Sequence, residues 1–190
     1  VWWGLFGGAL GLGLLSKHAM VFFLLGFIVD SLWRRQDEPL WQRGRFWCAI
    51  GLAVVIYFPN LMWNWSLGFP SYLHTGENIN INGNLINPIK ALEFLASQFG
   101  VFGPILLACY LGLIGMLLMR RSNGEVLTDR QRQLFSYSLP ILVLITVEAF
   151  LTRAHANWAA TAYVAATVLV AAELIQRNRT NWLKGSLAVH

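Results

Sequence analysis

The stretch FPNLMWNWSLGFPSYLHTGENININGNLINP, residues 58–88, decides how the chain is organised, because it is a long polar interval with strongly apolar sequence on both sides. It begins with aromatic residues of the kind that lie at a membrane boundary. His74, Glu77 and asparagines at 78, 80, 82 and 84 follow. In an extended segment these amides share one side, where they donate and accept hydrogen bonds as sugar hydroxyls require. We interpret the stretch either as a ligand-binding loop that faces water or as a solvated connector without chemistry.

The composition is that of a polytopic membrane protein. Hydrophobic residues make up 56% of the 190-residue chain and charged residues only 12%, and the mean hydropathy is +0.53. The net charge of +5 does not indicate a nucleic-acid partner, because the Lys and Arg residues cluster between apolar segments, as membrane topology requires. Cys48 and Cys109 lie in apolar segments without metal-ligand spacing, so we expect buried thiols and no metal site.

Six apolar segments predict about six transmembrane helices, since about 20 residues cross roughly 30 Å of hydrocarbon. The segments are 1–16, 19–33, 47–64, 99–119, 134–152 and 158–176. The expected fold is all-α, with one transmembrane domain over residues 1–190, and we interpret the chain as a fragment of a longer membrane domain. The first two segments are either two short helices that meet at Lys17 and His18 or one long tilted helix. Glycines in the first segment predict close helix packing.

The distribution of positive charge predicts the orientation of these helices. Eleven of the fourteen Lys and Arg residues lie in three connections, which hold Arg34, Arg35, Arg43 and Arg45, then Arg120, Arg121, Arg130 and Arg132, then Arg177, Arg179 and Lys184. The positive-inside rule makes these connections and both ends of the chain cytoplasmic, and it makes residues 65–98 a long external loop. The last part of that loop, 87–98, begins at a proline and has apolar residues at helical spacing. We predict an interfacial helix there, on the outer face.

Ionisable residues at membrane boundaries are candidates for function because they are costly there. By the predicted topology, the external ends of the segments carry Lys17, His18, His74, Glu77, Glu148, Arg153 and His155. Arg153 has a planar guanidinium that fits a phosphate or a carboxylate, and its short turn also holds His155 and Asn157. The alternative is an ion pair of Arg153 with Glu148 and no binding role. Asp30 and Glu173, near the cytoplasmic ends, are expected to pair with nearby arginines.

The external cations favour an anionic, lipid-linked substrate. Together Lys17, His18, Arg153 and His155 can neutralise a diphosphate or a phosphodiester at the outer boundary of the membrane. The chain has no HExxH, no nucleophile elbow, no Walker loop and no Gly-rich dinucleotide turn. These absences argue against soluble nucleotide chemistry, so a substrate that reaches the site through the membrane fits better.

Four blocks of the sequence, GLGLLSKHAMVFFLLGFIVDSLW, FPNLMWNWSLGFPSYLHT, NPIKALEFLASQFGVFGPILL and RAHANWAATAYVAA, resemble bacterial members of glycosyltransferase family 39. These are membrane enzymes of the GT-C fold that resemble dolichyl-phosphate-mannose protein mannosyltransferases. They are also similar to transferases that add galacturonic acid or aminoarabinose to lipopolysaccharide. The resemblance spans nearly the whole chain and places it in the C-terminal part of the family's membrane domain.

The resemblance implies transfer of a sugar from a polyprenyl-phosphate carrier, with no clear cofactor, to a glycan, lipid or protein acceptor at the periplasmic face of the inner membrane. In the family an aspartate in the first external loop is catalytic. No residue here matches it, and we expect this piece to lack that base.

The resemblance also suggests roles for the candidate residues. Lys17, with His18 beside it, and the turn from Arg153 to Asn157 would contact the carrier phosphate or the acceptor, while His74 and Glu77 would line the external cavity. The rival hypothesis is a transporter or flippase of a lipid-linked substrate. A transporter places its charges near the membrane midplane, whereas the predicted topology gathers them at one face, and this favours the enzyme.

Overall fold

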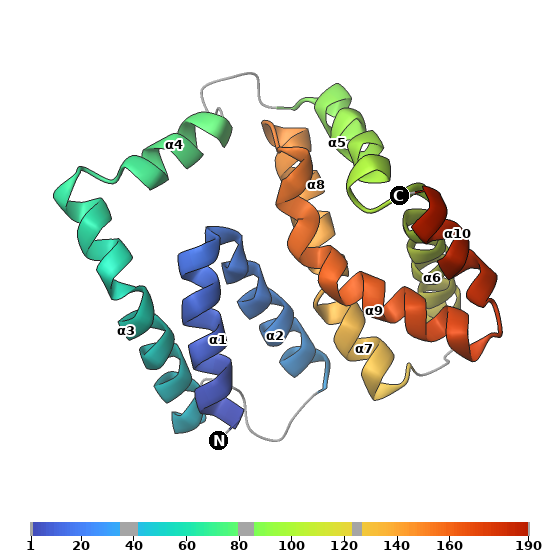
Figure 1. The fold of residues 1–190 in the computed structure, drawn as a ribbon, viewed down its shortest axis with the longest axis horizontal. Helices are drawn as coiled ribbons and strands as arrows, with labels where there is room; N and C mark the ends of the chain where they lie inside the picture. Colours follow the sequence, from blue (N-terminus) through green and yellow to red (C-terminus); the bar gives the residue numbers. More distant parts are fainter. Residues whose placement is uncertain (1, 35–41, 80–85, 123–126, 190) are drawn as a thin grey trace. The chain divides into compact units, whose positions relative to one another are not determined.

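The computed structural model describes residues 2–34, 42–79, 86–122 and 127–189, and within them all regular secondary structure is helical (Figure 1). Three of the described helices are long and apolar enough to cross a membrane, namely Gly44–Ser66, Asp129–Leu151 and Ala156–Gln176. A fourth span results if the bent pair Pro88–Val101 and Pro104–Met119 counts as one. Two more apolar helices, Trp2–Ser16 and His18–Trp33, are shorter. The prediction of an all-α membrane protein is confirmed.

The described residues group into two compact units, Val1–Gly83 and Asn84–His190. The first unit contains α1 (Trp2–Ser16), the short 3-10 helix η1 (His18–Met20), α2 (Val21–Trp33), α3 (Gly44–Ser66) and α4 (Pro70–Ile79). α1 and α2 are separate helices that pack side by side, because the ring of Phe27 lies 4.9 Å from Phe6 and 5.8 Å from Trp3 between centroids. The alternative of one long tilted helix is therefore wrong.

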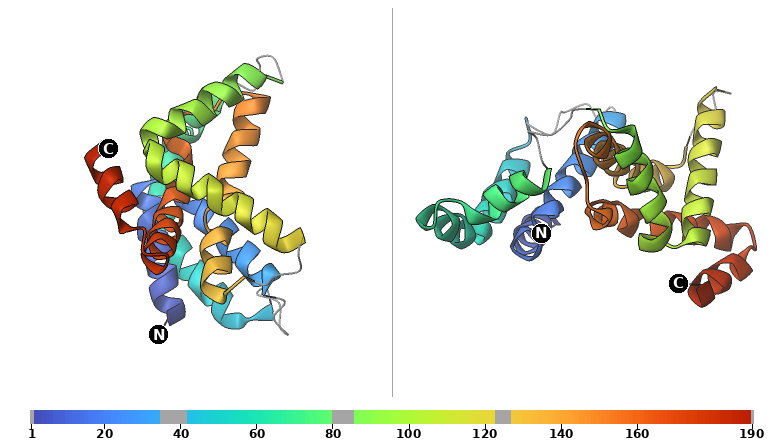
Figure 2. Two further views of the ribbon diagram at one scale, coloured as in Figure 1. Left: turned by 90° about the vertical axis from the view of Figure 1, so that its right-hand side faces the viewer. Right: turned by 90° about the horizontal axis from the view of Figure 1, so that it is seen from above.

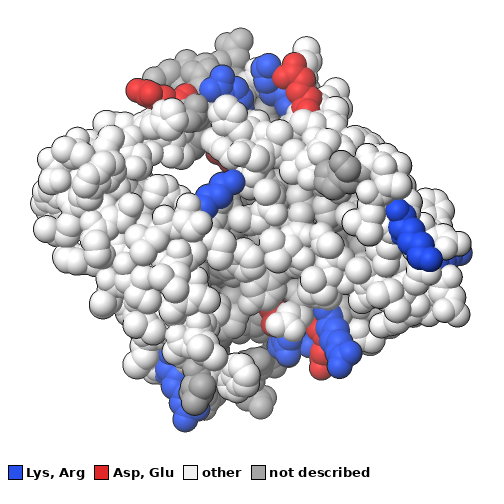
Figure 3. Space-filling view, viewed as in Figure 1, with Lys and Arg blue, Asp and Glu red and all other residues white. Residues whose placement is uncertain are grey.

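Glycines of α1 form its contact with α3, as predicted. A Cβ added at Gly7 would lie 2.4 Å from the carbonyl oxygen of Ala49, and one added at Gly11 would lie 3.0 Å from that of Ala53. Small residues four positions apart on both helices allow this approach of the backbones, which is a common way to pack membrane helices. The opposite face of α3 stays open to lipid, with Val55 70% exposed. Figure 3 shows that most of the visible surface carries no charge.

α3 ends in a turn built around Asn64. The backbone N–H of Phe69 donates to the Asn64 carbonyl oxygen at 2.7 Å, and Gly68 and Phe69 have positive φ values of 74° and 63°. The Asn64 side-chain oxygen accepts a hydrogen bond from the backbone N–H of Ser71 at 3.2 Å, in the first turn of α4. One buried amide thus joins the end of α3 to the start of α4.

α4 corrects the prediction of an extended segment. The chain is helical from Pro70 to Ile79, because a proline is well placed at the first position of a helix and Asn64 accepts one of the first N–H groups. The extended conformation is therefore wrong at Asn78 and Ile79. The remaining asparagines of the run, Asn80, Asn82 and Asn84, lie outside the described residues.

The second unit is built around α9. It contains α5 (Pro88–Val101), α6 (Pro104–Ser122), α7 (Asp129–Ser136), α8 (Leu139–Leu151), η3 (Ala156–Ala159), α9 (Ala160–Gln176) and α10 (Thr180–Val189). α9 contacts α6, α7, α8 and α10. Ala162, Ala166 and Val170 of α9 are fully buried, and the alanines let neighbouring helices approach closely. The core of this unit therefore lies along α9.

A sharp bend separates α5 from α6. The axes of the two helices differ by 118°, and Figure 2 shows their change of direction. The bend falls at Gly103, which has a φ of 85°, and at Pro104, which cannot donate a hydrogen bond to a preceding turn. The predicted helix over 99–119 is therefore wrong at its start, because residues 99–101 belong to α5. The helix predicted over 87–98 is present and begins at Pro88. Its Leu92 is 65% exposed, as expected for a face that meets lipid.

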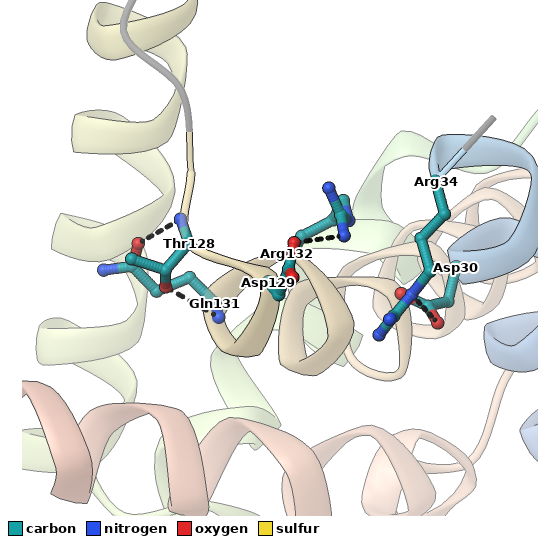
Figure 4. Close-up of polar contacts among 6 residues, drawn as sticks. All are labelled: Asp30, Arg34, Thr128, Asp129, Gln131 and Arg132. Carbon is teal, nitrogen blue, oxygen red and sulfur yellow. Dashed lines mark hydrogen bonds and ion pairs between the residues drawn. The ribbon is translucent and has the colours of Figure 1, made fainter. Parts of the chain in front are cut away.

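The acidic residues near the predicted cytoplasmic ends pair with arginines, as expected. Asp30 accepts a hydrogen bond from Arg34 at 2.8 Å, and Glu173 pairs with Arg177 at 3.1 Å. Figure 4 shows the Asp30 pair and, at the start of α7, the capping box in which Thr128 and Gln131 exchange hydrogen bonds. Arg35 and the side chains of Arg120 and Arg121 lie outside the described residues. The expectation of two buried thiols is wrong for Cys48, which is exposed on α3, while Cys109 is partly buried.

Candidate functional site

The turn that carries Arg153 faces α5 across a cavity of about 330 Å³. The cavity is lined by Lys90, Glu93, Phe94 and Ser97 of α5 and by Arg153, Ala154, His155 and Ala156 of the connection between α8 and α9. We call it the Arg153 cavity. It brings together two elements that the sequence places on the external side, the predicted interfacial helix and the short basic turn.

A backbone hydrogen bond joins the start of α5 to the end of α8, from which the Arg153 turn continues. The N–H of Ile86 donates to the carbonyl oxygen of Leu151 at 3.2 Å, so the chain that enters α5 runs beside the end of α8. α8 leads directly into the turn. α5 and the turn therefore start from a common anchor, and the Arg153 cavity opens just beyond it.

Gln98 fixes the other side of the turn. Its side chain is 1% exposed, and its Nε2 donates to the carbonyl oxygens of Phe94 at 2.8 Å and Ala156 at 3.3 Å. Its Oε1 accepts a hydrogen bond from the hydroxyl of Tyr163 at 2.8 Å. One buried amide thus connects α5, the turn and α9, which leaves Arg153 and His155 on a defined stretch of backbone.

The Arg153 cavity has an excess of positive charge. Lys90 Nζ lies 2.7 Å from Glu93 Oε2, but both side chains are about half exposed, at 47% and 58%, so the pair contributes only about 0–1 kcal/mol. The Lys90 ammonium can therefore leave the Glu93 carboxylate and pair with an anionic ligand at little cost. Arg153 and His155 are exposed, and the His155 ring lies 5.2 Å from Trp158. The arrangement is suited to bind a phosphate or a carboxylate, with Glu93 and Ser97 beside it for hydroxyl groups.

A second group of predicted residues lies in the first unit. The His18 ring stacks on Tyr72 of α4 at 5.7 Å and meets the edge of Tyr57 at 5.9 Å, and the two tyrosine hydroxyls share a hydrogen bond of 3.1 Å. His18 is therefore anchored against the helix that carries His74 and Glu77, both of which are exposed. An aromatic platform with nearby polar side chains is typical of a surface that binds sugars or other flat polar ligands.

The predicted site residues thus fall into two sets. Lys17, His18, His74 and Glu77 belong to the first unit, and Arg153, His155 and Asn157 belong to the second. Arg153 and His155 line one cavity, whereas Asn157 is exposed in η3 and is not among the lining residues. The joint anion site of Lys17 with Arg153 and His155 stays a prediction, and so does the ion pair of Arg153 with Glu148. Within the described part of the chain, no group of three or more His, Cys, Asp and Glu residues is placed to hold a metal ion.

Sequence reasoning missed the part of the site that lies on α5. Lys90, Glu93 and Ser97 line the cavity but were not proposed as site residues, although a helix was expected there. The available signal was the spacing of Lys90, Phe94 and Ser97, which places them on one face, opposite Leu92. Nothing in the sequence indicated that this face meets the Arg153 turn.

Comparison with known proteins shows a similarity to a glycosyltransferase. Over 163 residues, or 86% of this chain, the sequence is 35% identical to the lipid A galacturonosyltransferase RgtD of Rhizobium johnstonii. The match covers 33% of that protein, so the chain spans about a third of its length. No family model matches the chain, and no solved structure matches it. The similarity supports a relationship to glycosyltransferases, while the narrower assignment to family 39 has no support from it.

Proposed function

We propose that the chain is part of a membrane glycosyltransferase of the GT-C type, related to family 39. It transfers a sugar from a polyprenyl-phosphate carrier to an acceptor at the periplasmic face of the inner membrane. The similarity to a lipid A galacturonosyltransferase supports the reaction class. The Arg153 cavity supports an anionic, lipid-linked substrate.

The observation that carries the proposal is the position of the Arg153 cavity beside a helix, α5, whose apolar residues are exposed. Lys90, Arg153 and His155 line the cavity, while Ile89 and Leu92 of the same helix are 68% and 65% exposed. A polyprenyl phosphate is a charged group on a long apolar chain. Such a ligand places its phosphate among the cations while its chain leaves the cavity past Ile89, the neighbour of Lys90, so neither part is desolvated without compensation.

The residues of the cavity have distinct proposed roles in binding. The Arg153 guanidinium makes two hydrogen bonds to the carrier phosphate. His155 donates a further one or accepts a proton. Lys90 leaves Glu93 to pair with the ligand, and the released Glu93 accepts hydrogen bonds from sugar hydroxyls. We assign the catalytic base to no residue, because none matches the catalytic aspartate of the family that the chain resembles.

A finer proposal concerns the sugar and the acceptor. The activity in the name of the similar enzyme suggests a uronic acid as the sugar and lipid A as the acceptor. A carrier-linked uronic acid has two anionic groups, the phosphate and the sugar carboxylate, and the cavity has two permanent cations, Lys90 and Arg153. Removal of Lys90 should therefore weaken binding of a uronic acid donor more than binding of a neutral hexose donor.

The proposal is tested by carrier binding to the complete protein, purified in detergent. Two charge-assisted hydrogen bonds of roughly 1.5–3 kcal/mol each predict that Arg153→Ala weakens binding of the carrier-linked sugar by at least about tenfold. Arg153→Lys should restore only part of this loss, because lysine keeps the charge without the fork. Arg130→Ala is the matched control, since Arg130 is an exposed arginine that does not line the cavity.

The alternative role of Arg153, an ion pair with Glu148, predicts a different result. Arg153→Ala would then lower the melting temperature and leave carrier affinity unchanged, and Glu148→Gln in the same chain would restore stability. Unchanged affinity in Arg153→Ala therefore overturns the binding role of the cavity.

A transporter or flippase of a lipid-linked substrate is the second candidate, and the bend of 118° between α5 and α6 is the observation that favours it. Broken helices often form transport pathways. Proteoliposomes that contain a labelled lipid-linked sugar separate the two functions. Transfer of the label to an acceptor supports the enzyme, whereas movement of the intact lipid across the bilayer without transfer supports the transporter.

A further inference from the structure

A second cavity lies at the other end of α9. It has a volume of about 300 Å³. Its walls include Gly112, Leu113 and Met116 of α6, Val170 and Leu174 of α9, and Arg179 in the turn before α10. We call it the α6–α9 cavity. α9 has 17 residues and is therefore about 25 Å long at 1.5 Å per residue. The Arg153 cavity lies before the start of α9 and the α6–α9 cavity lies toward its end, so a membrane crossed by α9 would have the two near opposite boundaries.

The α6–α9 cavity has one positive charge in excess. Arg177 lines it and pairs with Glu173, to which its Nε and Nη2 atoms donate at 3.2 and 3.1 Å. Glu173 is buried and also accepts a hydrogen bond from Gln131. The charges of Arg177 and Glu173 therefore compensate each other. Arg179 lines the same cavity, and no carboxylate of the described residues pairs with it.

We propose that the α6–α9 cavity binds an anionic glycerophospholipid of the surrounding bilayer. The lipid phosphate pairs with Arg179, and an acyl chain lies along Leu113 and Val170. This site is distinct from the Arg153 cavity and does not rest on the proposed glycosyltransferase activity.

The walls of the cavity determine the class of ligand. α9 belongs to a helix that is long and apolar enough to cross a membrane, and α6 to the bent pair that passes the same test, so the proposal has the lipid enter the cavity from the bilayer. Most of the wall is apolar, which suits acyl chains, and its uncompensated cation lies at the end, where phospholipid head groups lie. The volume falls at the lower end of the range of about 300–1,000 Å³ that is common for ligand sites, so it accommodates part of one lipid. A soluble anion would satisfy Arg179 but leave the apolar wall without a partner.

The test uses the complete protein in nanodiscs of phosphatidylcholine, with phosphatidylglycerol added in increasing amounts. Native mass spectrometry reports retained lipid, and thermal denaturation reports the stabilisation that bound lipid confers. We expect phosphatidylglycerol to be retained and to raise the melting temperature. Arg179→Gln should weaken this binding by about tenfold. Lys184→Gln on α10 removes an exposed cation outside the cavity and should not change it.

Two glycines of α6 allow a test that fills the cavity without changing any charge. A Cβ added at Gly112 or at Gly115 has no heavy atom within 4 Å, so neither position resists a larger residue through its Cβ. Gly112 lines the cavity and Gly115 does not. Gly112→Leu should fill the cavity and abolish the effect of phosphatidylglycerol, while Gly115→Leu should preserve it.

The outcomes decide the proposal. Equal stabilisation by phosphatidylglycerol and by phosphatidylcholine, or retained lipid binding in both Arg179→Gln and Gly112→Leu, overturns it. If Gly112→Leu melts lower than the parent in pure phosphatidylcholine, Arg179→Gln alone decides, because Arg179 is exposed and its replacement leaves the core intact. A last measurement replaces phosphatidylglycerol with free inorganic phosphate. If phosphate raises the melting temperature as much as phosphatidylglycerol does, the cavity binds anions without any need for a lipid, and the lipid proposal is overturned.

Discussion

Gln98→Leu should both destabilise the second unit and weaken ligand binding at the Arg153 cavity. The substitution removes the acceptor of the Tyr163 hydroxyl and the donor to the Ala156 carbonyl oxygen. Tyr163 is only 6% exposed, so its hydroxyl finds no water to replace Gln98. Leaving such a group unsatisfied costs about 1–3 kcal/mol, and the weaker bond of 3.3 Å to Ala156 adds about 0.5–1 kcal/mol.

The expected loss is therefore about 1.5–4 kcal/mol, which corresponds to a fall in melting temperature of roughly 6–16 °C at about 4 °C per kcal/mol for a unit of this size. Thermal denaturation of the purified protein in detergent measures it. Carrier affinity should fall as well, because the turn that holds Arg153 loses its buried anchor while its own side chains are unchanged. Gln98→Glu is the informative comparison, since glutamate keeps the acceptor for Tyr163 and loses the donor to Ala156.

A double substitution tests the reasoning directly. Tyr163→Phe removes the hydroxyl that Gln98→Leu leaves unsatisfied, so the two changes together should cost less than the sum of the two alone. Phe102, which stacks on the Tyr163 ring at 4.1 Å, keeps its partner in both variants. Strict additivity of the melting-temperature changes would refute the role of the Gln98 and Tyr163 hydrogen bond.

Three further predictions concern the first unit and the topology. Gly7→Leu should destabilise the first unit by more than about 2 kcal/mol, because the backbone of α3 fills the space of its Cβ. A Cβ added at Gly4 meets no atom within 4 Å, so the control Gly4→Leu should be tolerated, and equal melting temperatures of the two variants would contradict this. Asn64→Leu should free the start of α4 and raise its hydrogen exchange, because the amide accepts from the Ser71 N–H; unchanged protection there would count against it. A cysteine at Ser71 should react with an impermeant reagent from outside, and one at Ser122 should not, in a background without native cysteines; the reverse pattern would invert the topology.

The sequence predicted the features that arise from local composition and spacing. Apolar segments gave the helices, Pro88 marked the start of α5, and the glycines of α1 indicated its close contact with α3. The bend at Gly103 was missed because the apolar pattern continues through it, and hydropathy does not register a change of direction. α4 was missed because asparagines at alternate positions favoured an extended interpretation, whereas the helix depends on an amide fourteen residues upstream of Asn78.

The candidate site was predictable only in part, for a similar reason. Arg153 and His155 stand out because charge is rare in this chain, and rarity is visible in a sequence. Lys90 and Glu93 do not stand out, because an exposed pair three residues apart is ordinary on a helix surface. Their importance follows from what lies opposite them, which depends on the anchoring of the turn by Gln98, and a single sequence does not encode that contact in any local pattern.

Two buried amides determine where the candidate site residues lie. Apolar burial gives little preference for one helix arrangement over another within a bilayer, because lipid tails are as apolar as the side chains they replace. A buried amide does give such a preference, because its donors and acceptors are satisfied in only one arrangement. Asn64 links α3 to the helix that carries His74, and Gln98 links α5 to the turn that carries Arg153. Each amide is almost completely inaccessible, each bridges separate elements, and neither lies in the candidate site. If Arg153 contacts the ligand as proposed, a variant at Gln98 should alter affinity together with stability, whereas a variant at Arg153 should alter affinity alone.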